Sequence, residues 1–76
     1  MHHPEYRTPD IVLAAYLKLS GCIMQRIEKQ GQKGTFVFEN VSDVVVRTFD
    51  LGQAKVEPVS FNNMIKQLTT SVRRMD

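Results

Sequence analysis

The 76-residue sequence contains one cysteine, no tryptophan and no long apolar run. One cysteine excludes an intramolecular disulfide framework and a cysteine-based zinc cage. No apolar stretch approaches the roughly 18 residues expected of a membrane span, so we expect no membrane segment. Neither charge sign dominates, because ten Lys and Arg stand against eight Asp and Glu. These absences point to a small soluble domain that folds without disulfides.

The composition is that of a globular chain, with 42% apolar residues and a net charge of +2. A chain of this length forms one domain, whose own core rarely supplies more than roughly 3–5 kcal/mol. Self-association is therefore the expected additional support. The first six residues lack the apolar segment of a secretory signal, and a single cysteine suits a reducing compartment, so we expect a cytoplasmic protein. We expect residues 1–7 to form a flexible N-terminal arm and residues 8–76 a single compact domain.

The first predicted helix begins at Thr8, whose hydroxyl fits an N-cap. Pro9 fits the first helical position, and Asp10 complements the helix dipole. Gly21 tolerates the positive φ of a helix end. Between these limits the segment is apolar almost all round, and after Asp10 its only charge is Lys18. Such a helix is either sandwiched between a sheet and another helix or part of an oligomer interface.

A β-hairpin is predicted next. Residues 22–29 and 35–39 alternate in polarity, and the connecting residues 30–34 include two glycines. Alternate positions of the two strands predict one shared apolar face, made of Ile23, Ile27, Phe36 and Phe38.

Residues 43–51 fit either a helix or a third strand. Asn40 or Ser42 can cap a helix, and Gly52 can end it. The β-branched run 44–46 fits a strand equally well.

The last helix is predicted from Pro58, capped by Glu57, or from one turn later, capped by Ser60. Arg73 and Arg74 lie near its C-terminus, where cations are favoured. Its apolar stripe has steps of three and four residues, namely Phe61, Met64, Ile65, Leu68, Val72 and Met75.

These elements predict an α+β fold in the order α-β-β-α-α, with a two-stranded antiparallel hairpin packed against three helices. The predicted core consists of Leu13, Leu17, Ile23, Ile27, Phe36, Phe38, Val45, Phe49, Phe61, Ile65, Leu68 and Val72.

Three short motifs in this order resemble a small bacterial family known as domain of unknown function 5659, over about residues 7–72. The resemblance implies no known activity and no catalytic residues. It favours a helix for residues 43–51, although similar sequences carry acidic helix formers where this chain has valines. The motifs are Thr8 and Asp10 before Ala14, Ala15, Tyr16, Leu17 and Gly21; Phe36, Val37, Phe38 and Glu39; and Ala54, Lys55, Val56, Glu57 and Pro58 before Phe61 and Leu68.

No residue pattern predicts an enzyme, a cofactor site or a metal site. His2 and His3, either native or a cloning remnant, are adjacent in the expected arm and do not preorganise a metal site. Cys22 has no histidine nearby to act as its base, so it is interpreted as a small apolar residue. Gly31 and Gly34 lie between two strands, whereas a phosphate-binding loop joins a strand to a helix.

The leading hypothesis is a non-enzymatic interaction or assembly module that self-associates. Its partner is a second copy, bound through the hairpin edge or the apolar helix face, or an unknown protein. The alternative is a small nucleic-acid-binding accessory protein, suggested by a sequence pI of about 8.9. Its candidate contacts are the basic residues of the hairpin and last helix: Arg26, Lys29, Lys33, Lys66, Arg73 and Arg74.

Overall fold

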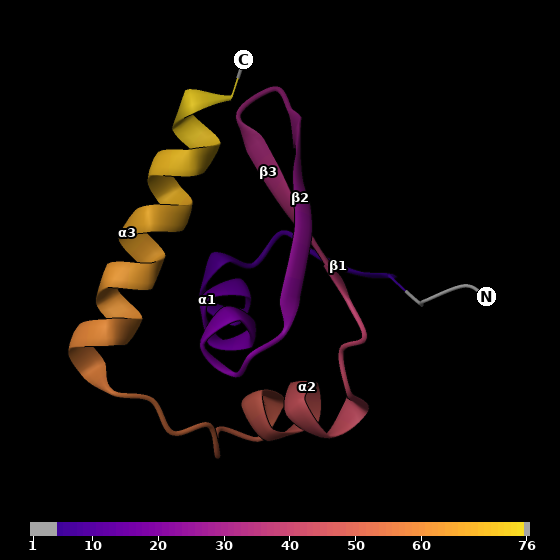
Figure 1. The fold of residues 1–76 in the computed structure, drawn as a ribbon, viewed down its shortest axis with the longest axis vertical. Coiled ribbons are helices and arrows are strands. Elements are labelled where there is room, and N and C mark those ends of the chain that lie inside the picture. The colour runs from indigo at the N-terminus through magenta and orange to yellow at the C-terminus, as the bar shows by residue number, and fades with distance from the viewer. Residues whose placement is uncertain (1–4, 76) are drawn as a thin grey trace.

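The computed structural model describes residues 5–75 and shows a three-stranded antiparallel sheet with three helices. The strands lie in the order β1-β3-β2. Figure 1 shows α1 between the strands and α3, with α2 at one end of this arrangement. The predicted α+β class is confirmed. The elements are β1 (Glu5–Thr8), α1 (Ile11–Leu19), β2 (Ile23–Gln30), β3 (Lys33–Glu39), α2 (Asp43–Asp50) and α3 (Pro58–Arg74).

The expected two-stranded sheet is wrong, because β1 adds a third strand. Tyr6 lies opposite Phe38 and Thr8 lies opposite Phe36. The side chains of Tyr6 and Thr8 therefore face the core. Thr8 is 5% exposed. Residues 5–7, expected in the flexible arm, thus belong to the sheet, whereas residues 1–4 lie outside the described part of the chain. Four residues with a single aromatic side chain give too short an alternation to be recognised as a strand.

Asp10, and not Thr8, is the N-cap of α1. Its Oδ1 accepts hydrogen bonds from the backbone N–H groups of Val12 and Leu13, at 2.9 and 3.3 Å. Thr8 ends β1, and its Oγ1 accepts a hydrogen bond from the Asp10 N–H. The predicted capping chemistry is therefore present, but it lies two residues later than expected.

The apolar character of α1 follows from its position between the sheet and α3. Ala14 and Ala15 are fully buried, and their small side chains allow the neighbouring elements to approach closely. Leu17 is fully buried as well. The helix ends as predicted at Gly21, which has a φ of 93°, and the N–H of Cys22 donates to the Leu17 carbonyl.

A β-bulge changes which side chains of β2 face the core. Met24 lies opposite Phe38, but the next paired residue is Arg26 and not Gln25. The extra residue reverses the alternation. Consequently Met24 packs against the core, whereas Ile23 is 59% exposed, so the predicted core position of Ile23 is wrong.

The hairpin turn is tighter than predicted. Gln30 pairs directly with Lys33, so only two residues connect the strands, and Gly31 adopts a φ of 63°. Gly34 therefore lies within β3. A Cβ atom at Gly34 would come within 2.9 Å of Val72 Cγ2, which shows how closely the backbone of β3 approaches α3.

Residues 43–50 form a helix, in spite of their β-branched run. Ser42 provides the cap, because its Oγ accepts from the Val44 N–H at 3.1 Å. Val45 and Phe49 share one face and pack against the core. Capping and this spacing outweigh the weak strand preference of the valines.

The start of α3 follows the first of the two predicted alternatives. Glu57 caps it through hydrogen bonds from the Val59 and Ser60 N–H groups, at 3.1 and 2.6 Å, and Pro58 takes the first helical position. The predicted start at Ser60 is wrong.

Most of the predicted core is confirmed. Leu13, Leu17, Phe36, Phe38 and Leu68 are buried. The other predicted core residues, apart from Ile23, are partly buried and pack against them: Ile27, Val45, Phe49, Phe61, Ile65 and Val72.

Candidate interaction surface

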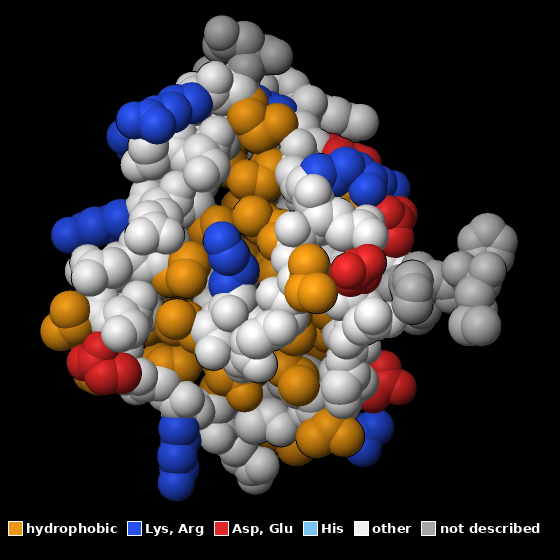
Figure 2. All heavy atoms as spheres, viewed as in Figure 1, with side chains coloured by type: hydrophobic (Ala, Val, Ile, Leu, Met, Phe, Trp, Pro, Cys, Tyr) orange, Lys and Arg blue, Asp and Glu red, His pale blue; other side chains and the backbone are white. Residues whose placement is uncertain are grey.

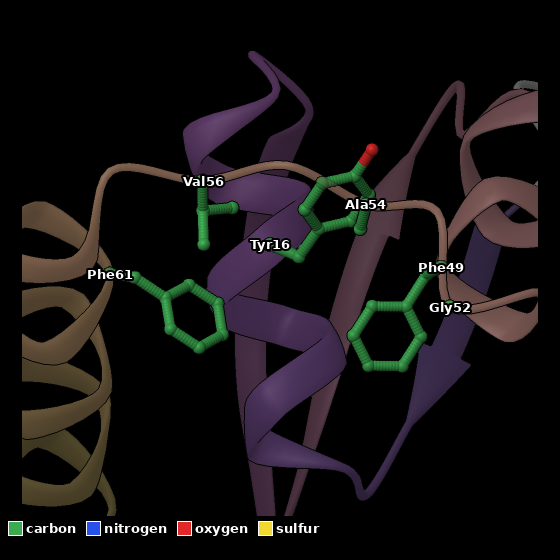
Figure 3. Close-up of a pocket in the computed structure, with 6 residues that line it drawn as sticks. All are labelled: Tyr16, Phe49, Gly52, Ala54, Val56 and Phe61. Carbon is green, nitrogen blue, oxygen red and sulfur yellow. The ribbon is translucent and has the colours of Figure 1, made fainter.

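An apolar hollow lies where α1 faces α2, α3 and the segment that connects these two helices. Figure 3 shows Tyr16 of α1 between Phe49 of α2 and Phe61 of α3, with the connecting segment crossing above. The volume of the hollow is about 270 Å³. We call this hollow and its neighbour, described next, the α1 groove. The first hollow is lined by Tyr16, Phe49, Gly52, Ala54, Val56 and Phe61.

A second hollow of about 290 Å³ adjoins the first, because Tyr16 and Val56 line both. Its further lining includes Leu19 of α1 and Ser60 of α3. The rings of Tyr16 and Phe49 lie 5.7 Å apart with a tilt of 33°, a geometry within the favourable range for aromatic pairs. This contact joins α1 to α2 and forms one wall of the α1 groove.

One stripe of α1 remains accessible, whereas the rest of the helix is buried or half-buried. Val12, Tyr16 and Leu19 are spaced by four and three residues and therefore share a face. Val12 is 40% exposed and Leu19 39% exposed. Val59, on the first turn of α3, is 66% exposed. The exposed Leu19 thus lines the α1 groove, and the exposed Val59 directly precedes the lining residue Ser60.

Two charged side chains line the α1 groove, Lys55 and Glu57. The N–H groups of Ser60 and Val59 hold the pKa of Glu57 below its usual value, because they donate hydrogen bonds to its carboxylate. Glu57 thus remains an anion that caps α3. This environment provides an apolar wall with a rim of both charge signs, which suits protein contact.

The opposite surface, the outer face of the sheet, carries a network of four charged residues. Arg26 donates to Glu5 and to Glu28, each at 2.9 Å, and Arg7 pairs with the same two carboxylates. Val37 lies between Arg7 and Arg26 in the sheet and is fully buried. The network therefore covers this apolar side chain.

The network is expected to make stability depend on acidic pH. Arg26 donates hydrogen bonds to Glu5 and Glu28 and holds the pKa of both below the usual 4.5. Because the folded-state pKa is depressed, this stabilisation is fully present above pH 4.5 and is lost as the pH falls through the folded-state values.

In urea unfolding at pH 7 and pH 3, Glu28→Gln should show a smaller fall in midpoint than the parent chain. Glu39→Gln is the matched control for loss of one carboxylate, and an equal effect of both changes would contradict the network's role.

The sheet has two edges, β1 and β2, since β3 lies in the middle. The longer edge, β2, contains the bulge and the charged residues Arg26, Glu28 and Lys29. Bulges and charges are features that discourage edge-to-edge pairing of strands. The hairpin edge is therefore a less suitable surface for self-association than the α1 groove.

The six basic residues predicted to contact nucleic acid do not form one group. Arg26 is held in the network on the outer sheet face. Lys29 donates to the Met75 carbonyl. Arg73 lines a cleft with Gln32 of the hairpin turn, and the exposed Lys33 begins β3 directly after that turn. Lys66 and Arg74 line a separate hollow on α3.

The residues weighed for chemistry show no catalytic arrangement within the described chain. Burial raises the pKa of the partly buried Cys22 thiol and so disfavours the reactive thiolate. In residues 5–75, no three His, Cys, Asp or Glu side chains gather as metal ligands. His2 and His3 lie outside the described residues. No helix formed by residues 5–75 is long and apolar enough to cross a membrane.

The α1 groove was only partly predictable from the sequence. The all-round apolar pattern of α1 signalled two-sided burial or an interface, and the structure shows burial with one stripe left accessible. The contribution of residues 52–57 was missed, because a short connector without periodicity carries no signal of which helix it covers.

Comparison with protein families gives one match, which covers nearly the whole described fold. The matching family is described as Domain of unknown function (DUF5659), and the match extends over residues 3–73. No curated protein and no solved structure matches the chain. The chain therefore belongs to the DUF5659 family.

Proposed function

We propose that this domain is a non-enzymatic interaction module that associates with a second copy of itself through the α1 groove. The observation that carries the proposal is the accessible stripe of Val12, Tyr16 and Leu19 on a helix whose other residues are buried or half-buried. A domain of this size gains useful stability from further apolar burial. An assembly role also agrees with the apolar lining of the groove.

The shape of the surface supports a second copy as the occupant. In a twofold dimer the same patch serves both subunits, so a projection on one must meet a hollow on the other. Val59 is exposed on the first turn of α3 and directly precedes Ser60, which lines the same hollow as Leu19 and Val56. Lys55 and Glu57 at the rim have opposite charges, which makes the patch compatible with itself.

Sedimentation velocity over a wide concentration range tests this proposal. The parent chain should sediment faster as its concentration rises. Leu19→Lys places a charge in the buried interface and should weaken association at least tenfold, which corresponds to about 1.4 kcal/mol. Val59→Lys should act in the same direction, whereas circular dichroism should remain unchanged because both side chains are exposed in the single chain.

Val44→Lys is the matched control, since Val44 is 68% exposed but neither lines the groove nor adjoins a lining residue in the sequence. It should leave association unchanged. Ile23→Lys tests the alternative interface, the β2 edge. A monomeric parent chain at all concentrations, or dissociation caused by Ile23→Lys and not by Leu19→Lys, would contradict the proposal.

We also infer a cytoplasmic setting. The sequence has a single cysteine, and its partly buried position in the fold suits a reduced thiol.

A further inference from the structure

The helix α3 carries a second surface, which shares no lining residue with the α1 groove. A hollow of about 410 Å³ runs along it and is lined by two cations and three hydrogen-bonding side chains. Lys66, Thr70 and Arg74 follow one another at intervals of four residues and therefore share one face of the helix. We call this surface the α3 basic face, and its lining residues are Lys66, Gln67, Thr70, Ser71 and Arg74.

The α3 basic face has no acidic residue on its own helix. The sequence from Pro58 to Arg74 contains no Asp or Glu. Within residues 5–75, the α3 cations enter no ion pair, in contrast to Arg7 and Arg26 of the sheet. In Figure 2 blue side chains lie along the α3 edge, and red appears on this edge only near the start of the helix.

The tip of the hairpin extends this surface beyond the end of α3. Arg73 and Gln32 line one cleft of about 250 Å³, which places the hairpin turn beside the last turn of the helix. Lys33, which begins β3 directly after that turn, is exposed. Figure 1 shows the tip and the C-terminal end of α3 at the same end of the molecule. Two further cations, Arg73 and Lys33, thus lie at the C-terminal end of α3.

We infer that the α3 basic face and the adjoining hairpin tip bind the phosphate backbone of double-stranded nucleic acid without reading its sequence. Lys66 and Arg74 are eight residues apart, which is about 12 Å along a helix. Phosphates recur about every 3.4 Å per strand along a duplex, so this distance spans several of them. The Thr70 hydroxyl and the Gln67 amide are further donors of the kind that contact phosphate oxygens.

A duplex fits this surface better than a single strand. Binding of single strands depends on aromatic side chains on which bases stack. The aromatic residue of α3, Phe61, faces the α1 groove and not the basic face. The surface therefore offers charge and hydrogen-bond donors but no stacking platform, and we expect salt-sensitive backbone contacts.

Fluorescence anisotropy with a labelled duplex of about 20 base pairs tests the inference in salt from about 50 to 200 mM. The parent chain should bind more weakly as salt rises. The variant with Lys66→Gln, Arg73→Gln and Arg74→Gln should lose at least tenfold in affinity at the lowest salt. For this variant the slope of log affinity against log salt should become shallower by about 2.7, since each of three lost phosphate contacts contributes about 0.9 to the slope.

A control removes charge elsewhere, through Lys18→Gln and Arg47→Gln, because these two cations line neither the α1 groove nor the α3 basic face. This variant should keep most of the affinity, and circular dichroism should confirm that both variants are folded. The inference is overturned if the parent chain does not bind, or if both variants lose affinity equally. Tighter binding of a single strand of the same length would overturn it in favour of base stacking. Tighter binding of poly-glutamate would overturn it in favour of an acidic protein partner. Sedimentation of the chain alone tests the α1 groove separately, so failure of one proposal does not decide the other.

Discussion

A chain that begins at Thr8 is expected to be largely unfolded at 25 °C, whereas a chain that begins at Glu5 should fold. The shorter chain lacks Tyr6 and most of the hydrogen bonds between β1 and β3. It also uncovers Phe38 and Val37, which are fully buried in the complete sheet. Net hydrogen bonds contribute about 0.5–1.5 kcal/mol each, and burial of a large side chain about 1.5–3 kcal/mol. The loss is therefore comparable to the roughly 3–5 kcal/mol that a small core supplies.

Far-UV circular dichroism with urea titration measures this difference directly. Comparison of the two truncated chains isolates the contribution of residues 5–7. If their urea midpoints agree closely, these residues form a dispensable arm, and the strand β1 does not contribute to stability.

The second large effect is expected from a single added methyl group. Gly34→Ala would place a Cβ 2.9 Å from Cγ2 of Val72, closer than such atoms approach in folded proteins. Val72 is β-branched and lies in a helix, so its side chain has little freedom to rotate away. Overpacking of this kind costs about 1–3 kcal/mol in the free energy of unfolding. Gly34 has no positive φ, so backbone strain does not contribute.

Combination with Val72→Ala identifies the cause. Val72→Ala alone removes packing atoms and should destabilise the chain. In the double variant the two changes should compensate in part, so that its loss is smaller than the sum of the single losses. Strictly additive losses in urea unfolding would show that Gly34 and Val72 do not restrict one another.

The elements that the sequence predicted well are those with a local signal. The last helix has an apolar stripe of several turns, a proline at its first position and a capping glutamate, and the structure confirms all three. The helix at residues 43–50 was one of two alternatives, and Ser42 together with the inward spacing of Val45 and Phe49 decided it. Local patterns of this kind do not depend on distant parts of the chain.

The elements that the sequence did not predict depend on distant partners. The strand at Glu5–Thr8 exists because β3 offers it a free edge, which no local pattern reveals. The exposed position of Ile23 depends on the bulge at Gln25, since one extra residue reverses the sheet face on which the preceding side chains of β2 lie. The tight turn at Gly31 follows from the register of the whole hairpin.

The candidate sites divide in the same way. The cations of α3 were predictable as a group because they lie on one helix. Arg26 belongs by sequence to the hairpin cations, but the unexpected strand brings Glu5 beside it and fixes it in an ion-pair network. The α1 groove depends on where residues 52–57 cross α1, which is decided only when all three helices are in place.

The strand order β1-β3-β2 also constrains the order in which the chain can assemble. The β2–β3 hairpin closes a short loop, with Gln30 opposite Lys33, so its pairing requires little loss of chain entropy. Pairing of Glu5 with Glu39 must close a much longer loop that contains α1 and the hairpin itself. During synthesis the first strand emerges early but has no partner until the third is complete. The strand β1 is therefore the last part of the sheet to pair. The transition state for folding should contain the paired hairpin but not yet the pairing of β1 with β3.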